Sequence, residues 1–249
     1  MSTKRIMFWD IETSLSILSS FTLHNDYISP ENILKDWHII CASWKYLGDK
    51  RVYSVSVLDN KNKDIDNDLY VVKALSDAIK DVDLLVAHNG DKFDVKKLNA
   101  RLMYHNLDPL PAVLTLDTHK EIKKVACFTS HKLSYLGPHL GVGEKLKNTP
   151  GLWIKILGGD IKCIKEMIEY NKVDTVLLEK LYLRTRKYYK TPPNLAPDGE
   201  LACTTCQSYN IQARGYNTTK SGLRYQRYKC NACSSWFQGR TSLGKSLAK

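Results

Sequence analysis

Long hydrophobic runs are missing from this sequence of 249 residues. No apolar stretch approaches the roughly eighteen residues that a membrane-spanning helix needs, and the N-terminus has no apolar segment of the signal-peptide kind. Internal repeats and low-complexity tracts are absent as well. We therefore expect a globular protein that works in the cytoplasm and does not enter membranes. Its length suits one large domain, or one medium and one small domain.

Acidic residues are absent from one part of the chain, between Leu201 and Lys249. The whole chain has 37 Lys and Arg against 26 Asp and Glu, a formal net charge of +11. The acid-free tail contributes eight positive charges, from Arg214, Lys220, Arg224, Arg227, Lys229, Arg240, Lys245 and Lys249. Such a basic chain favours a polyanionic partner, with nucleic acid the leading candidate.

The segment Ile6–Thr13 combines an apolar run with two acids. Four apolar residues lead into Asp10, and Glu12 follows two positions later. Side chains alternate along a strand, so these two carboxylates point the same way. The apolar run is typical of a strand buried on both faces. Two carboxylates at the end of such a strand repel each other unless a cation lies between them, and divalent metal ions usually fill that role.

Hydrophobic patterning predicts strands that alternate with helices along the first part of the chain. Strands are expected at 6–13, 37–47, 51–58, 83–89 and 112–117. Helices are expected at 69–82, 93–104, 119–126, 132–140, 160–170 and 174–189. We expect 15–36 to be a loop or short helix and 148–159 to be a loop. This order predicts an α/β layer fold, a mixed sheet flanked by helices.

Prolines mark a boundary after residue 190. The run Thr-Pro-Pro-Asn at 191–194 and Pro-Asp-Gly at 197–199 both break regular structure. We therefore expect a first domain at 1–190, a linker at 191–200 and a small second domain at 201–249.

Three more side chains join the two acids of the first strand. Asp94 falls in the first turn of a helix that follows a strand. Tyr170 and Asp174 lie four residues apart, hence on one face of a helix. Taken singly, Asp94 suits a helix start, where the helix dipole favours an acid, and Tyr170 suits an ordinary core position.

Taken together, these residues form three short motifs in chain order: Asp10-x-Glu12, Asn89-x-x-x-Phe93-Asp94 and Tyr170-x-x-x-Asp174. In order, spacing and setting they resemble the exonuclease motifs of the DEDD family. This family comprises 3′–5′ exonucleases on a ribonuclease H-like fold and includes proofreading domains of DNA polymerases. The resemblance covers about residues 1–190. One branch has a histidine five residues before the last acid and the other a tyrosine four before it, so Glu169 and Tyr170 imply the tyrosine branch.

The resemblance also implies roles for the residues. Phosphodiester hydrolysis needs an activated water and stabilised attacking and leaving oxygens, which two Mg²⁺ or Mn²⁺ ions supply. Asp10 would bridge both ions, and Glu12 and Asp174 would hold the ion that activates water. Asp94 would hold the second ion, largely through water. Tyr170 would orient the attacking water, because a tyrosine with a pKa of about 10 is a poor base at neutral pH.

Three other polar residues end predicted strands. Asp117, with Thr118 after it, resembles an Asp-Thr pair in some relatives, but we interpret Asp117 as structural rather than as a metal ligand. His88 and Asn89 could line the site, although hydrogen bonding at a strand end is the simpler interpretation.

Seven cysteines are present, an odd number. Four form two C-x-x-C pairs, and such pairs in a cytoplasmic chain indicate a metal site rather than disulfides. Each pair aims two thiolates at one ion, and the arrangement resembles a zinc ribbon with one structural Zn²⁺. The ligands would be Cys203, Cys206, Cys230 and Cys233. We interpret Cys41, Cys127 and Cys163 as buried small residues.

The ribbon interleaves aromatic residues with its cations. Exposed rings beside cations suit stacking on unpaired bases together with phosphate contacts. The alternative is that the rings form a small core and the cations only keep it soluble. We predict that the nucleic-acid-binding residues are Arg214, Lys220, Arg224, Arg227, Lys229 and Trp236.

The sequence therefore predicts a two-metal 3′–5′ exonuclease, with DNA favoured over RNA, whose zinc ribbon helps to hold the substrate. The whole arrangement is similar to exonucleases of tailed bacteriophages, which would place it in the host cytoplasm. A structure-selective endonuclease on branched DNA and a non-catalytic nucleic-acid-binding protein are the alternatives. Strand preference, protein partners and oligomeric state stay open.

Overall fold

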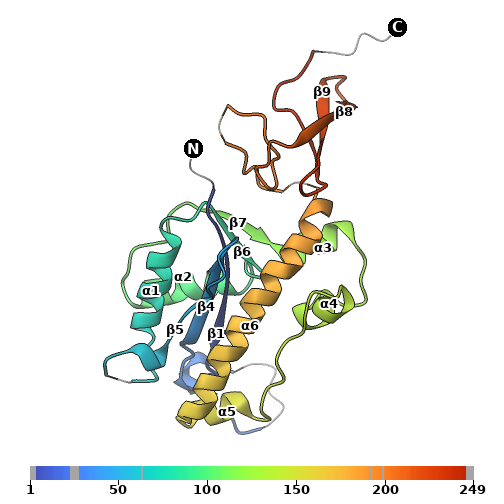
Figure 1. The fold of residues 1–249 in the computed structure, drawn as a ribbon. Coiled ribbons are helices and arrows are strands. Elements are labelled where there is room, and N and C mark those ends of the chain that lie inside the picture. Colours follow the sequence, from blue (N-terminus) through green and yellow to red (C-terminus); the bar gives the residue numbers. More distant parts are fainter. Residues whose placement is uncertain (1–3, 23–27, 63, 191, 198, 245–249) are drawn as a thin grey trace.

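The computed structural model describes residues 4–22, 28–62, 64–190, 192–197 and 199–244. Its centre is a five-stranded sheet in the order β5-β4-β1-β6-β7 (Figure 1). β4 pairs antiparallel with β1 and β5, whereas β6 pairs parallel with β1 and β7. The strands are β1 Ile6–Thr13, β4 Ile39–Tyr46, β5 Tyr53–Ser56, β6 Leu84–Ala87 and β7 Leu114–Asp117. The prediction of a mixed sheet is confirmed.

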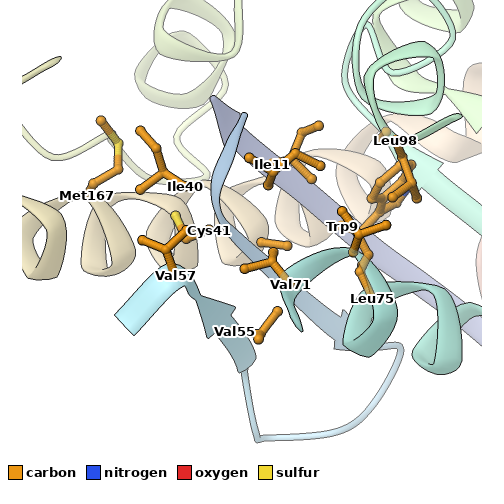
Figure 2. Packing of buried hydrophobic residues seen from close by; sticks show 14 of the residues in the cluster. Trp9, Ile11, Ile40, Cys41, Val55, Val57, Val71, Leu75, Leu98 and Met167 are labelled. Atoms are coloured by element: carbon orange, nitrogen blue, oxygen red, sulfur yellow. The ribbon is translucent and has the colours of Figure 1, made fainter. Parts of the chain in front are cut away.

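Side chains of β1 alternate between two hydrophobic clusters, one on each face of the sheet. Met7, Trp9 and Ile11 belong to the first cluster, and Figure 2 labels Trp9 and Ile11. Ile6 and Phe8 belong to the second. The two acids of β1 continue the even-numbered series of the second cluster, so the alternation that builds the core also sets the face on which the acids lie.

Helices flank the sheet and complete both clusters (Figure 1). α1 and α2 pack in the first cluster, and α3 and α4 in the second; α6 contributes its first half to one and its second half to the other. The helices are α1 Leu69–Ile79, α2 Asp94–Tyr104, α3 Thr118–Val125, α4 Leu133–His139, α5 Leu152–Leu157 and α6 Ile161–Thr185. Short 3₁₀ helices occur at Pro30–Asn32, Val57–Asp59 and Arg186–Tyr188.

The prediction of two helices at 160–170 and 174–189 is wrong, because α6 is one helix of 25 residues. Asp160 caps the N-terminus of this helix, since its carboxylate accepts hydrogen bonds from two amides of the first turn. The apparent break reflects buried polar residues, not a loop. Thr175 is fully buried beside Ser43 of β4, whose hydroxyl donates to the Asn171 carbonyl at 2.9 Å. These contacts let α6 cross β4 without an apolar stripe.

Two stretches that were expected to be irregular contain regular structure. Within 148–159, α5 forms and buries Leu152 and Ile156 in the first cluster, so the prediction of a loop there is wrong. Within 15–36, β2 (Ile17–Leu18) pairs antiparallel with β3 (Ile33–Lys35). Residues 23–27 of that stretch lie outside the described residues.

A second, three-stranded antiparallel sheet follows near the C-terminus, in the order β10-β9-β8. Its strands are β8 Ile211–Thr218, β9 Arg224–Cys230 and β10 Trp236–Gln238. β8 and β9 form a hairpin, with a bulge between Ala213 and Tyr216 where Gly215 takes a φ of 68°. Of the basic tail, Lys245 and Lys249 lie outside the described residues.

Several contacts among the described residues join the C-terminal sheet region to the rest of the chain, including hydrogen bonds from Arg240 to the carbonyls of Ala196 and Pro197. The Lys4 amide, just before β1, donates to the Gln207 side chain at 3.0 Å. Leu195 packs in the second hydrophobic cluster, and its amide donates to the Thr204 carbonyl at 2.9 Å. The division into 1–190, 191–200 and 201–249 stays a prediction. Among the described residues, no helix combines the length and apolar character needed to cross a membrane.

Candidate functional site

The acid-bearing end of β1 has a strand on one side only. In the described chain, β1 pairs with β6 over Ile6–Phe8, whereas its pairing with β4 continues to Thr13. Beside the unpaired stretch lies Asp94, whose Oδ1 accepts a hydrogen bond from the Ile11 amide at 3.2 Å. The start of α2 therefore holds its acid against the strand that carries the other two.

The connection from β6 to α2 is tight. Asn89 has a φ of 68°, and a Cβ at Gly90 would lie 2.3 Å from the Cβ of Ala87. Asparagine tolerates the left-handed conformation, and only glycine avoids the clash. This turn brings Asp94 to β1 directly after β6, with 2% of the residue exposed.

The middle of α6 supplies the remaining acid. Asp174 is 3% exposed, and the side chain of Asn171, one turn earlier, donates to Asp10 Oδ2 at 2.7 Å. Carboxylate oxygens of Asp10, Glu12 and Asp174 all lie within 4.8 Å of one another. Two of the predicted motifs thus meet in one cluster, and Asp94 stands next to it.

A lysine that the motifs did not indicate also enters the site. Lys145, from the segment between α4 and α5, donates to Asp174 Oδ2 at 2.5 Å and to the Tyr170 hydroxyl at 3.0 Å. Burial disfavours its ammonium, but Asp174 and Tyr170 outweigh that effect and raise the pKa of Lys145. No periodic or motif signal distinguishes this residue from the other lysines around it; only the fold brings it to the acids.

Crowding raises the pKa of every carboxyl group in the site. Burial, then the neighbouring carboxylates, raise the pKa of Asp10 well above its ordinary value. Burial and the Asp174 carboxylate raise the pKa of Glu12 to about 7. The pKa of Asp94 also rises to about 7, chiefly through burial. For Asp174, burial outweighs Lys145 and again raises the pKa. The protein holds four carboxyl groups where their negative charges are costly.

This donor set fits hard divalent ions. Five buried side-chain oxygens of the described residues have no hydrogen-bond partner, and two of them, Asp174 Oδ1 and Asn171 Oδ1, belong to this site. Buried oxygens are normally satisfied, and carboxylate and amide oxygens are the ligands that Mg²⁺ and Mn²⁺ prefer. Asn171 is the second residue that the motifs did not indicate, although it lies beside Tyr170 in the sequence.

Asp117 has a structural role, as we interpreted it. Its Oδ1 accepts from the amides of His119 and Lys120 at the start of α3 and from the Asn89 amide at 2.9 Å. It thereby supports the turn that leads to Asp94. The His88 ring is hydrogen-bonded on both nitrogens, to the Thr118 hydroxyl at 2.9 Å and to the His131 carbonyl at 2.8 Å.

The four C-terminal cysteines converge, with their sulfur atoms within 4.8 Å of one another. Cys203 and Cys233, and likewise Cys206 and Cys230, have Sγ atoms 3.6 Å apart. Tetrahedral Zn²⁺ with Zn–S distances of about 2.3 Å places its sulfur ligands about 3.8 Å apart. The cluster therefore suggests a zinc site.

Two turns of the same form present these cysteines. In one, the Gln207 amide donates to the Cys203 carbonyl at 2.9 Å, and in the other Ser234 donates to Cys230 at the same distance. Gln207 and Ser234 both have φ near 60°, at 63° and 61°. Of the other cysteines, Cys41 and Cys163 are buried as predicted, but Cys127 is exposed, so that prediction is wrong.

The predicted nucleic-acid-binding residues all lie on the C-terminal sheet or its turn. The Arg227 guanidinium lies 4.9 Å from the Trp236 ring centroid, and Arg224 lies 4.4 Å from the ring of Tyr216. Trp236 and Tyr216 are 49% and 52% exposed. β9 carries Arg224, Arg227 and Lys229, β8 carries Arg214, the turn between them carries Lys220, and β10 carries Trp236.

Comparisons with known proteins place this fold. Residues 36–185 match the RNase H superfamily, and the chain belongs to that superfamily. Among solved structures, the fold is similar to the family B DNA polymerase from the hyperthermophilic archaeon Pyrobaculum calidifontis, with a TM-score of 0.55 and 15% identity. The match covers 75% of this chain but only 25% of the polymerase chain. No curated protein sequence matches. The expectation of a ribonuclease H-like fold is confirmed.

Proposed function

We propose that this chain is a two-metal 3′–5′ exonuclease of the DEDD type, in the tyrosine branch, acting on DNA in preference to RNA. The observation that carries the proposal is the convergence of Asp10, Glu12 and Asp174 within 4.8 Å, with Asp94 hydrogen-bonded to the same strand. The occurrence of this fold within part of a DNA polymerase agrees with a nucleic-acid substrate.

The acids would hold the metal ions. Asp10, Glu12 and Asp174 form one ligand group and Asp94 a neighbouring one. Two divalent ions, when bound, would lower the pKa of a bound water and neutralise charge on the attacking and leaving oxygens. Asn171 fixes the orientation of the Asp10 carboxylate through its hydrogen bond. Because the pKa values of Glu12 and Asp94 are near 7, metal binding should strengthen as pH rises to that value.

Tyr170 is suited to orienting a water rather than to removing its proton. Burial raises the pKa of its hydroxyl, so the group stays protonated at neutral pH. Lys145 donates to the hydroxyl oxygen, which leaves the tyrosine proton for another acceptor. The same ammonium partly neutralises Asp174. A positioned donor of this kind near the reacting atoms accounts for a substantial part of the rate in other hydrolases.

Product analysis tests the proposal. Single-stranded, duplex and branched DNA and RNA, labelled at the 5′ or the 3′ end, are incubated with Mg²⁺ or Mn²⁺. An exonuclease of this polarity releases the 3′ label at once as a mononucleotide, while the 5′ label shortens stepwise. Asp10→Asn serves as the inactive control. Internal fragments as first products would establish the endonuclease, and binding without hydrolysis would establish a non-catalytic protein.

A further inference from the structure

A groove of about 550 Å³ runs between the end of the first domain and the C-terminal sheet. All three residues of β10 line it, and Arg227 of β9 and Asn217 of β8 lie beside them. The opposite wall comes from the segment after α6, with Lys190, Pro192 and Asn194, together with Thr204 near the first cysteine pair. The groove is thus lined by the segment that follows α6 and by the C-terminal sheet; Figure 1 shows the C-terminal end of α6 next to this sheet.

Aromatic and polar side chains of the C-terminal sheet lie together on one of its two faces. In the antiparallel register Trp236 pairs with Lys229 and Gln238 with Arg227, so these four side chains share a face. Asn217 joins them from β8, and its side-chain amide donates to Gln238 Oε1 at 2.8 Å. The opposite face carries Tyr228 and Phe237, whose rings stack at 5.4 Å. Both of these rings are half-buried, whereas Trp236 on the groove side is 49% exposed.

The groove combines a ring, cations and amides without an acid. Arg227 lies over the Trp236 ring, yet the tryptophan remains about half exposed. Lys190 adds a second cation from the opposite wall, and none of the residues that line the groove is acidic. An exposed indole is a stacking platform for any base. Cations on both walls suit phosphates, and the free groups of side-chain amides suit the edge of a base.

We propose that this groove binds an unpaired nucleotide of a single-stranded substrate. The base would stack on Trp236, with Asn217 and Gln238 at its edge and with Arg227 and Lys190 near the flanking phosphates. A base inside a duplex already stacks on its neighbours and cannot reach the indole, so the groove selects single strands. The proposal rests on the proposed function only for the kind of ligand, because binding here needs neither the acids nor their metals.

Fluorescence anisotropy with labelled ten-nucleotide oligothymidylate tests this groove. The protein is the zinc-loaded full chain with Asp10→Asn, measured without added Mg²⁺ or Mn²⁺ so that nothing is cleaved. In this background Trp236→Ala should weaken binding about 10- to 100-fold, the loss expected for one stacked base. Trp236→Phe, which keeps a ring, should recover most of that loss. Zinc content of one ion per chain verifies that each variant keeps its ribbon.

Tyr216→Ala is the matched control. Tyr216 is equally exposed and is covered by Arg224 in the same way, but it lies on the opposite face of the sheet. Its replacement should change affinity less than about 3-fold, and Trp236→Ala should affect a blunt duplex of the same length equally little. Two results would contradict the proposed binding site. One is an equal loss of affinity for Trp236→Ala and Tyr216→Ala, and the other is an equal loss of affinity for single strands and for duplex. Tight binding by the wild-type protein that is not followed by hydrolysis in Mg²⁺ or Mn²⁺ would instead refute the exonuclease and leave the proposed groove site intact.

Discussion

Two clusters of like ligands occur in this molecule, and their surroundings differ. The carboxylates of Asp10, Glu12 and Asp174 lie on β1 and α6, which pack in two large hydrophobic clusters. The cysteines lie in turns of a small sheet, and among the described residues after 200 the buried apolar ones are Ala202, Cys203 and Cys230. The core therefore assembles the acids without help, whereas we expect the cysteine cluster to depend on a bound metal ion.

The two sites differ in how the repulsion between their negatively charged ligands is relieved. In the acidic site, the fold forces the carboxyl groups together, and raised pKa values and Lys145 partly relieve the charge. In the cysteine site, two tight turns set the sulfur positions, and the pairing of Ile211 with Cys230 links the turns. We expect a bound metal ion to supply most of the remaining stability of this site. Loss of metal should thus stop chemistry at one site and unfold the other.

Replacing an acid should have the largest effect. Asp174→Asn keeps the shape of the side chain but removes a metal ligand, so the rate of hydrolysis should fall at least about 1000-fold. Zinc content should stay at one ion per chain, because the cysteine site does not share this ligand. Asp77→Asn, at a surface acid of α1 that pairs with Lys80, is the control and should keep full activity. Near-normal activity of Asp174→Asn would refute the assignment of the site.

Tyr170→Phe removes one hydroxyl and no metal ligand. Turnover should fall about 10- to 1000-fold, as expected for one positioned hydrogen bond near the reacting atoms, while substrate affinity stays close to normal. Single-turnover rates and binding constants, measured side by side, separate the two effects. An unchanged rate would reduce Tyr170 to a packing residue and remove the reason for placing the chain in the tyrosine branch.

Removing the zinc ligands should act on binding rather than on chemistry. With Cys203→Ser and Cys206→Ser together, zinc is lost and the ribbon unfolds, so affinity should fall about 10- to 100-fold and its salt dependence should flatten. Turnover at saturating short substrate should largely survive. Deletion from Ala196 onward should give the same result, and Cys127→Ser, at an exposed cysteine outside the cluster, should change nothing. Equal salt slopes with and without the ribbon would show that it does not touch nucleic acid.

Lys145→Gln removes the only lysine found against Asp174 in the described residues. The metal-free protein should lose about 1–2 kcal/mol of unfolding free energy, because a buried carboxylate loses its partner while about a quarter of the lysine side chain is solvent-exposed. Saturating Mn²⁺ should restore most of this loss. Lys172→Gln, which breaks the exposed pair with Glu169, should cost less than about 0.5 kcal/mol. Denaturant titrations with and without Mn²⁺ measure both.

The smallest expected effect is on the stability of the metal-free protein, which Glu12→Gln should raise rather than lower. The pKa of Glu12 is about 7 in the folded state against an ordinary value of 4.5, so the folded state binds its proton more tightly than the unfolded state does. Metal-free stability should therefore fall as pH rises from about 4.5 to about 7. The variant should remove part of this fall and gain about 1 kcal/mol at pH 7, after allowance for solvent screening. Thermal unfolding across that pH range measures the difference; a parallel pH profile for both proteins would contradict it.

Much of the acidic site followed from the sequence because its signals are local. The alternation along β1 gives the common face of Asp10 and Glu12, and the four-residue spacing gives that of Tyr170 and Asp174. The sequence did not indicate that α6 is one continuous helix. Thr175 is a buried polar residue, and one of its hydrogen-bond partners, Ser43, is distant in the sequence and meets it only in the folded chain. Lys145 was hidden for the same reason: its partners are 25 and 29 residues away in the sequence.

In the C-terminal sheet too, local sequence patterns predicted the ligands but not the contacts between distant segments. The cysteine spacing predicted a zinc ribbon, since ligand spacing is a local property. The groove could not be predicted, because Lys190 and Trp236 stand on opposite walls that meet only after both parts have folded.

The length of α6 determines how long a nucleic-acid strand would have to be to reach both the acids and the groove. Asp174 lies in the middle of this uninterrupted helix, and Thr185 ends it beside the C-terminal sheet (Figure 1). Eleven residues at about 1.5 Å each place about 17 Å of helix between them. Under the proposed function, a strand whose 3′ end sat at the acids would have to be several nucleotides long before it also reached the proposed groove site. Oligonucleotides below that length would occupy one site at a time, and those above it would gain the effective concentration of a two-site ligand.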